Sequence, residues 1–139
     1  MKPVLYAEDD ANDVFFMRHV WKQAGVPNPL IHVKDGRQAI DYFAGHGHYA
    51  DRKKHPLPCL LLLDLNLPGK DGFEVLRWLR QTPGFETFKV VVVSGSNQTA
   101  DIAAAQKLGV TDYIIKTPIP KKLLETILEK KDLWLSGPV

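Results

Sequence analysis

The sequence predicts an α/β fold, a doubly wound parallel sheet of five strands in the order 2-1-3-4-5 with five helices. Two runs of leucine or valine alone, Leu60–Leu63 and Val90–Val93, are typical of strands that are buried on both faces of a parallel sheet. A segment with helical spacing follows each strand, so a strand–helix unit recurs five times. Such alternation favours right-handed crossovers and helices on both faces of the sheet.

Length and composition indicate a single domain over residues 1–139, with no output domain. The formal net charge of +2 gives no reason to expect a nucleic-acid or membrane partner. Acidic residues follow the N-terminus too soon for a signal peptide, and no apolar run approaches the roughly 18 residues of a membrane span. Cys59 is the one cysteine, which excludes an internal disulfide and fits a reducing compartment, so we expect the cytoplasm.

The first half of the chain contains two strand–helix units. The apolar run at residues 4–7 is expected to be the first strand, and it ends at a cluster of acidic residues. Apolar side chains recur at helical spacing over residues 12–24, before a Gly-Val-Pro sequence that ends the helix. Phe15 falls on the polar side of this helix, so we expect it to be exposed or covered by a loop. The second strand is expected at 30–33 and, after an Asp-Gly turn, the second helix at 37–44.

The segment Gly45–Pro56 is polar and basic and lacks periodicity, which predicts an extended loop. A loop of this length in a compact domain is often a binding feature. It contains His46, His48 and His55, and Cys59 follows, but their spacing matches no compact zinc site. We therefore expect surface histidines and a buried structural thiol rather than a metal centre.

The second half of the chain contains three more units: strand 60–63 with helix 73–80, strand 90–93 with helix 99–108, and strand 113–115 with a helix from 121 to about 130. Thr99 is a residue that can cap the fourth helix. Lys131 would fall within the apolar stripe of the last helix, so the final turn of that helix is expected to project beyond the core. The apolar residues Leu133–Leu135 would then pack elsewhere.

Polar side chains follow the carboxyl ends of four predicted strands. Ligands of open α/β sheets bind beyond these strand ends, where eight residues would converge: Glu8, Asp9, Asp10, Asp64, Asn66, Ser94, Ser96 and Lys116. Two carboxylates about 4 Å apart repel by roughly 4 kcal/mol at an effective dielectric constant of ~20, so three of them would be forced to take up a proton unless a cation neutralises them. Oxygen ligands in a small open site favour Mg²⁺.

A divalent ion beside a lysine forms a site for phosphate oxygens. In that setting Ser94 can donate a hydrogen bond to the phosphate, and Asp64 can be the nucleophile that forms an aspartyl phosphate. Each residue taken alone also fits an ordinary role: the acidic turn can cap a helix, Ser94 can be a loop residue and Lys116 can be a surface lysine. Their coincidence at four strand ends favours the phosphate site.

Four motifs are specific in combination: Glu8-Asp9-Asp10, Asp64-Leu65-Asn66-Leu67-Pro68-Gly69 with Asp71-Gly72, Ser94-Gly95, and Tyr113-Ile114-Ile115-Lys116. Together they resemble the receiver domains of two-component response regulators, which have a flavodoxin-like fold. The resemblance covers nearly the whole chain. The segment Gly45–Pro56 and the sequence around Asp64 are most similar to single-domain regulators that serve cyanobacterial phytochromes.

The resemblance implies a role for each acidic residue of the site. Asp64 stands at the position of the phosphoacceptor. Glu8 and Asp9 match the acidic pair that holds Mg²⁺ together with Asp64, and the backbone carbonyl of Asn66 matches a further ligand of that ion.

The resemblance also assigns the remaining site residues. Ser94 matches the hydroxyl residue that contacts the phosphoryl group, and Lys116 matches the lysine that pairs with it. Tyr113 matches the aromatic residue whose position is coupled to Ser94 on activation. Receivers usually carry a proline in cis after this lysine, whereas this chain has Thr117. A cis bond before threonine would cost about 2.5–4 kcal/mol, so we expect a trans bond.

The implied function is a stand-alone phosphoacceptor switch. A histidine kinase, of the phytochrome type by the resemblance, would donate a phosphoryl group to Asp64. The signal would leave through a downstream protein partner, through a phosphotransfer protein, or through a homodimer formed by the fourth helix, the fifth strand and the fifth helix. The chain would then not be an enzyme, beyond self-phosphotransfer and slow autodephosphorylation.

Two other functions are considered. One is a receiver-like binding module that works without phosphorylation, which only Thr117 supports and which the full set of acidic residues opposes. The other is a phosphatase that forms an aspartyl phosphate. Such an enzyme needs an acid two residues after the nucleophile, and Asn66 stands there.

Overall fold

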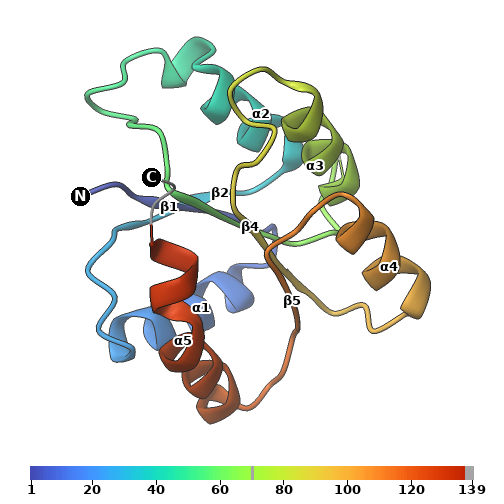
Figure 1. The fold of residues 1–139 in the computed structure, drawn as a ribbon. Coiled ribbons are helices and arrows are strands. Elements are labelled where there is room, and N and C mark those ends of the chain that lie inside the picture. Colours follow the sequence, from blue (N-terminus) through green and yellow to red (C-terminus); the bar gives the residue numbers. More distant parts are fainter. Residues whose placement is uncertain (70, 137–139) are drawn as a thin grey trace.

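The computed structural model describes residues 1–69 and 71–136, so the end of the domain predicted over 1–139 lies outside the described residues. Its centre is a five-stranded sheet in the order β2-β1-β3-β4-β5, and every pairing is parallel, which confirms the predicted topology (Figure 1). The strands are β1 (Val4–Ala7), β2 (Leu30–Val33), β3 (Leu60–Leu63), β4 (Val90–Ser94) and β5 (Asp112–Ile115). The helices are α1 (Ala11–Gln23), α2 (Gly36–Ala44), α3 (Gly72–Gln81), α4 (Thr99–Lys107), α5 (Pro120–Leu135) and the short 3₁₀ helix η1 (Gly47–Tyr49).

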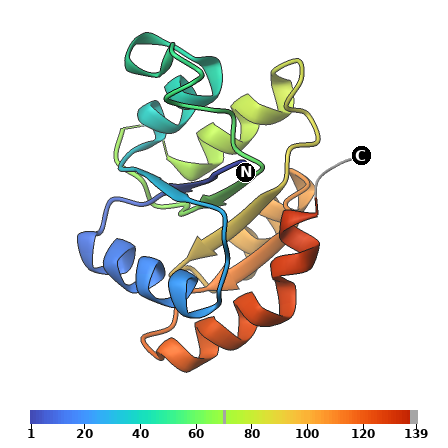
Figure 2. The ribbon, with the colours of Figure 1, turned by 90° about the vertical axis from the view of Figure 1, so that its left-hand side faces the viewer.

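Helices cover both faces of the sheet, with α1 and α5 side by side on one face and α2 and α3 on the other (Figures 1 and 2). Successive side chains of a strand point to opposite faces, so the leucine run of β3 divides between two cores. Leu60 and Leu62 pack with α1 and α5, whereas Leu61 and Leu63 pack with α2 and α3. This explains why β3 has no polar position.

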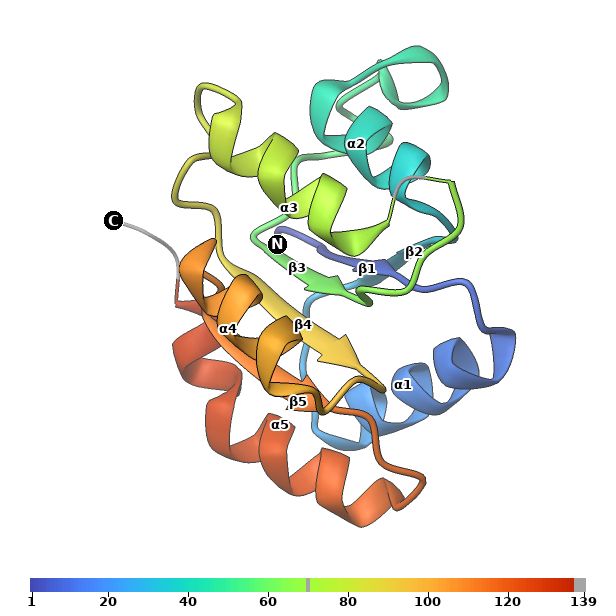
Figure 3. The same ribbon diagram turned by 90° about the vertical axis from the view of Figure 1, so that its right-hand side faces the viewer.

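Helix α4 lies beside β4 and β5 and is anchored more weakly than the other helices (Figure 3). Ala105 is its one buried residue, and it packs against Leu65 and Val92. Each of the other α-helices of the described chain buries at least three residues. A helix with so little buried apolar surface can shift at low cost.

The prediction for the end of α5 is wrong. The helix continues through Leu135, and Trp134 is 1% exposed, with its indole N–H donating to Asp112 Oδ2 at 3.3 Å. Lys131 does not break the apolar stripe, because its ammonium donates to the carbonyl oxygen of Ala24 at the end of α1 at 3.3 Å. Long lysine side chains can cover apolar surface with their stems in this way.

The segment Gly45–Pro56 is more ordered than the predicted extended loop. It contains η1, and the Arg52 guanidinium donates to the carbonyl oxygens of Tyr42 and Phe43, both at 2.7 Å, near the end of α2. Three rings of the segment pack with centroids 4.8–5.3 Å apart: His48, Tyr49 and His55. Cys59 is half-buried and lies instead beside Asn28, whose amide is 3.7 Å from the sulfur.

Aspartates cap three helices, with Asp10, Asp35 and Asp71 each accepting backbone N–H bonds of the first turn. Thr99 is not the cap of α4: the helix begins at Thr99, and the preceding residue makes no capping bond with its side chain. Phe15 is exposed, as expected. Among the described residues, no helix has the length and the apolar character to cross a bilayer.

Candidate functional site

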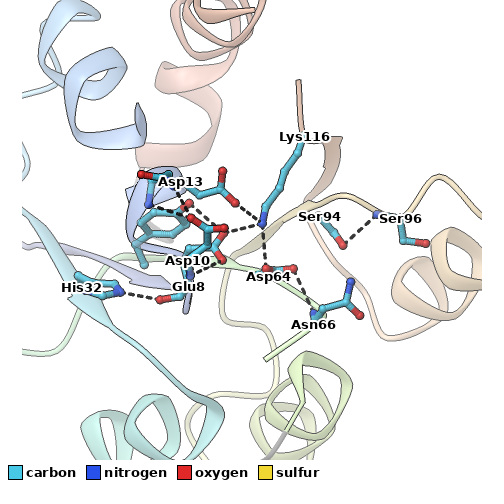
Figure 4. Close-up of polar contacts among 11 residues, drawn as sticks. Glu8, Asp10, Asp13, His32, Asp64, Asn66, Ser94, Ser96 and Lys116 are labelled. Carbon is cyan, nitrogen blue, oxygen red and sulfur yellow. Dashed lines mark hydrogen bonds and ion pairs between the residues drawn. The ribbon is translucent and has the colours of Figure 1, made fainter. Parts of the chain in front are cut away.

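The carboxyl ends of β1, β3, β4 and β5 bring the predicted site residues to one edge of the sheet, and Figure 4 labels most of them: Glu8, Asp10, Asp64, Asn66, Ser94, Ser96 and Lys116. The contacts of the site join residues up to 108 positions apart, since Glu8 follows β1 and Lys116 follows β5. Parallel strands make this convergence possible because all their carboxyl ends lie on the same side.

Three carboxylates form an acidic cluster at this edge: Glu8, Asp9 and Asp64. One oxygen from each lies within 4.8 Å of the others. Glu8 and Asp64 are buried, whereas Asp9 is exposed, so the cluster opens to solvent on one side. Glu8 is fixed by a hydrogen bond from the Tyr6 hydroxyl at 3.3 Å and by one from the backbone N–H of Asp10 at 3.3 Å.

The charges of the cluster are unfavourable without a cation. Burial raises the pKa of the Glu8 carboxyl to about 7, since the contact with Lys116 offsets only part of this effect and the charge on Asp64 adds to it. A divalent cation would favour the ionised form of Glu8, and carboxylate oxygens are ligands that Mg²⁺ and related ions prefer. The donor set therefore fits a divalent metal ion.

Lys116 joins the carboxylates to one another. Its ammonium lies 2.7 Å from Glu8 Oε1, 3.0 Å from Asp64 Oδ2 and 2.8 Å from Asp13 Oδ2 (Figure 4). Burial alone would lower the pKa of Lys116, but the three carboxylates outweigh it and raise that pKa, so the side chain stays charged. Asp13 is a contact that the sequence prediction missed. Its place in the first turn of the helix after the acidic motif was the available signal.

The loop after β3 places the Asp64 side chain. The backbone N–H of Asn66 donates to Asp64 Oδ1 at 3.1 Å, and Gly72 donates its N–H to the carbonyl of Leu65 at 2.9 Å. A Cβ on Gly72 would lie 2.5 Å from the carbonyl oxygen of Asp64. Only glycine therefore allows α3 to begin this close to the loop.

Ser94 and Tyr113 are linked through Ser96 rather than directly. Ser94 is fully buried, and its Oγ accepts the backbone N–H of Ser96 at 3.3 Å. The Tyr113 hydroxyl donates to the carbonyl of Ser96 at 2.9 Å, and the Ser96 hydroxyl donates to Asp101 Oδ2 of α4 at 2.5 Å. The loop after β4 thus connects the buried serine to β5 and to α4.

The backbone at Lys116 is regular. Its N–H donates to the carbonyl of Ser94 at 2.8 Å, which extends the pairing of β4 and β5 to the site. The bond between Lys116 and Thr117 is trans, as expected. The residues predicted to converge at the strand ends, together with Tyr113, therefore lie at one edge: Glu8, Asp9, Asp10, Asp64, Asn66, Ser94, Ser96, Tyr113 and Lys116.

Comparisons with known proteins identify the family of this chain. Residues 4–128 match the model of the response regulator receiver domain family. Response regulator Rcp1 of Synechocystis sp. is 34% identical over 134 residues, which cover 96% of this chain and 89% of that protein. A probable methanogenesis regulatory protein of Methanothrix harundinacea, FilR2, is 30% identical over 132 residues, 95% of this chain and 83% of its own length.

Solved structures show the same fold. The Mn²⁺-bound form of Rcp1 covers 100% of both chains with a TM-score of 0.86 and 33% identity. RPA3017, described in red light signalling of R. palustris, gives a TM-score of 0.91 at 32% identity over 100% of this chain and 97% of its own. The phosphorylated cyanobacterial phytochrome response regulator RcpA gives 0.86 at 33% identity, covering 99% and 96%. The predicted family is confirmed: this chain belongs to the response regulator receiver domains of two-component systems.

Proposed function

We propose that this response regulator accepts a phosphoryl group on Asp64 from the phosphohistidine of a histidine kinase, with Mg²⁺ held in the acidic cluster. One observation carries the proposal: Asp64 is 3% exposed and shares an oxygen cluster with Glu8 and Asp9, beside the Lys116 ammonium. A buried carboxylate between a cation site and a lysine is suited to hold a phosphoryl group.

The chemical step needs little beyond positioning. A carboxylate oxygen of Asp64 forms a bond to phosphorus while the phosphorus–nitrogen bond of the phosphohistidine breaks, and the electron pair of that bond stays on the imidazole nitrogen. Asn66 orients the carboxylate through its backbone N–H. The Lys116 N–H that donates to Asp64 can donate instead to a phosphoryl oxygen. Ser94 can donate its hydroxyl hydrogen to another oxygen, because its Oγ already accepts from Ser96.

The metal is proposed to be Mg²⁺. The carboxylates of Glu8, Asp9 and Asp64 supply its ligands, with the backbone carbonyl of Asn66 as a further one. The acidic cluster supports this assignment, and so does the Mn²⁺ in the related Rcp1 structure. When bound, the ion would neutralise phosphoryl oxygens as charge builds up on them.

The signal is proposed to leave through α4, β5 and α5. Phosphorylation of Asp64 would draw Ser94 towards the phosphoryl group, and the bonds of Ser96 to Tyr113 and to Asp101 would carry that movement to α4. Exposed apolar side chains on this face can meet a downstream protein or a second copy of the chain: Ile115, Ile119 and Leu128. The donor is proposed to be a phytochrome-type histidine kinase in the cytoplasm, as the similarity to RcpA suggests.

The test uses acetyl phosphate as donor, with and without Mg²⁺, and intact-protein mass spectrometry as the measurement. We expect one phosphoryl group on the unmutated protein only with Mg²⁺, and none on Asp64→Asn. Asp132→Asn is the matched control, since Asp132 is exposed on α5 and remote from the site, and it should be modified like the unmutated protein. An unmutated protein that stays unmodified, both with acetyl phosphate and with phosphorylated kinases, would favour the phosphorylation-independent binding module.

A further inference from the structure

Among the described residues, the ammonium of Lys116 has three carboxylate partners, and they are of two kinds. Glu8 and Asp64 belong to the acidic cluster that fits a metal ion, whereas Asp13 lies outside that cluster on the first turn of α1 (Figure 4). The Asp13 contact is 2.8 Å long, against 2.7 Å for the contact to Glu8, although the side chain of Asp13 is 40% exposed.

The site has to hold two cations at once. A divalent ion and the Lys116 ammonium both attract the oxygens of Glu8 and Asp64, and they repel each other. Once an ion occupies the acidic cluster, Asp13 is, within the described part of the chain, the carboxylate partner of Lys116 that the ion does not share. Asp13 can therefore keep the lysine in place while the other two carboxylates bind metal.

Local structure fixes Asp13 where this role requires it. The backbone N–H of Asp13 donates to Asp10 Oδ1 at 3.2 Å as part of the cap of α1. The buried side chains of Val14 and Met17 hold the same turn against the sheet. A carboxylate in the first turn is also favoured by the helix dipole. The backbone of Asp13 is thus held in place by contacts that do not involve Lys116.

We propose that Asp13 is a positioning residue, which holds the Lys116 ammonium beside the metal so that an N–H donor remains directed at the phosphoryl group on Asp64. The inference rests on the proposed function. Asp13 acts through Lys116 and does not itself touch the reacting atoms.

The first experiment compares Asp13→Ala with Asp132→Asn. Asp132→Asn also removes one negative charge, but from an exposed position on α5 that is remote from the site, so it controls for the change in net charge. At saturating Mg²⁺ and acetyl phosphate, we expect Asp13→Ala to be phosphorylated about tenfold more slowly, and Asp132→Asn to stay within about twofold of the unmutated rate. Asp13→Glu, which keeps the carboxylate, should recover part of the rate.

A double-mutant cycle with Lys116 separates positioning from a structural role. Because Asp13 acts through Lys116, Asp13→Ala should slow phosphorylation no further in a Lys116→Ala background. Equal slowing in both backgrounds, or an Asp13→Ala rate equal to that of Asp132→Asn, would overturn the inference. If circular dichroism shows that Asp13→Ala is unfolded, Asp13→Asn replaces it in the same cycle. Failure of the proposed function is distinguishable, because the unmutated protein would then not be modified at all.

Discussion

Glu8 is the residue whose environment is most at odds with its charge. It is 0% exposed, and its two oxygens contact the Tyr6 hydroxyl, the Asp10 backbone and the Lys116 ammonium. Burial still raises the pKa of its carboxyl to about 7. Stability is therefore lost in the metal-free protein in exchange for a carboxylate that is ready to bind a cation.

The raised pKa of Glu8 predicts how stability depends on pH. Between its ordinary value of 4.5 and about 7, the folded state binds more protons at Glu8 than the unfolded state does. This contribution to stability is therefore complete below pH 4.5 and is lost as pH rises through about 7. In EDTA, we expect the melting temperature of Glu8→Gln to fall less over this range than that of the unmutated protein, by a few degrees.

Thermal unfolding followed by circular dichroism at a series of pH values measures this difference. Glu125→Gln, which changes an exposed glutamate on α5, should follow the unmutated curve. Parallel curves for Glu8→Gln and the unmutated protein would show that Glu8 does not titrate in this range.

At the scale of single residues, the sequence was sufficient to predict that the groups at the strand ends meet, but it was not sufficient to predict the contact of Asp13 with Lys116. Glu8, Asp64 and Lys116 follow apolar runs, and the topology of a parallel sheet brings such positions together. The contact between Asp13 and Lys116 joins residues 103 positions apart and depends on how α1 is rotated against the sheet. No local pattern encodes that rotation.

Among the elements, α3 is placed by a close approach to the loop after β3. Its first residue, Gly72, has no side chain to separate the helix from the backbone of Asp64 and Leu65. The position of the helix and the position of the Asp64 carboxylate therefore depend on each other.

Gly72→Ala is expected to destabilise the protein by about 1–3 kcal/mol, because the added Cβ would lie 2.5 Å from two backbone atoms, and α3 must move. Phosphorylation should also slow, since Asp64 lies in the displaced loop. Gly95→Ala is the matched control: a Cβ there meets nothing within 4 Å, so stability should change little. Urea unfolding measures both variants, and equal midpoints would contradict the close approach.

The elements also show where prediction fails. Strands β3 and β4 were predicted correctly because both faces of each strand are buried, which requires a run of apolar residues that is easily recognised in the sequence. The end of α5 was missed because Lys131 looked like the end of an apolar stripe, whereas its ammonium reaches a carbonyl of α1. The order in Gly45–Pro56 was missed because it comes from Arg52 bonds to α2, which leave no periodic pattern.

For the molecule as a whole, the candidate metal site couples distant segments. The acidic cluster joins the ends of β1 and β3, the two central strands of the sheet, and Lys116 connects them to β5 and α1. An ion that binds only the folded arrangement must stabilise the entire fold, because unfolding separates its ligands.

Mg²⁺ is therefore expected to raise the melting temperature. At a Mg²⁺ concentration about 100 times the dissociation constant, binding to the folded state alone adds about 2.7 kcal/mol to the free energy of unfolding, or several degrees. EDTA should reverse the shift.

Asp9→Asn should lose most of the Mg²⁺-induced rise in melting temperature while folding normally without metal, because Asp9 is the exposed member of the cluster and its replacement leaves the core unchanged. Differential scanning calorimetry with and without Mg²⁺ measures the shift, with Asp132→Asn as the control. A melting temperature of the unmutated protein that Mg²⁺ leaves unchanged would contradict the metal site, and an Asp9→Asn shift as large as the unmutated one would exclude Asp9 as a ligand.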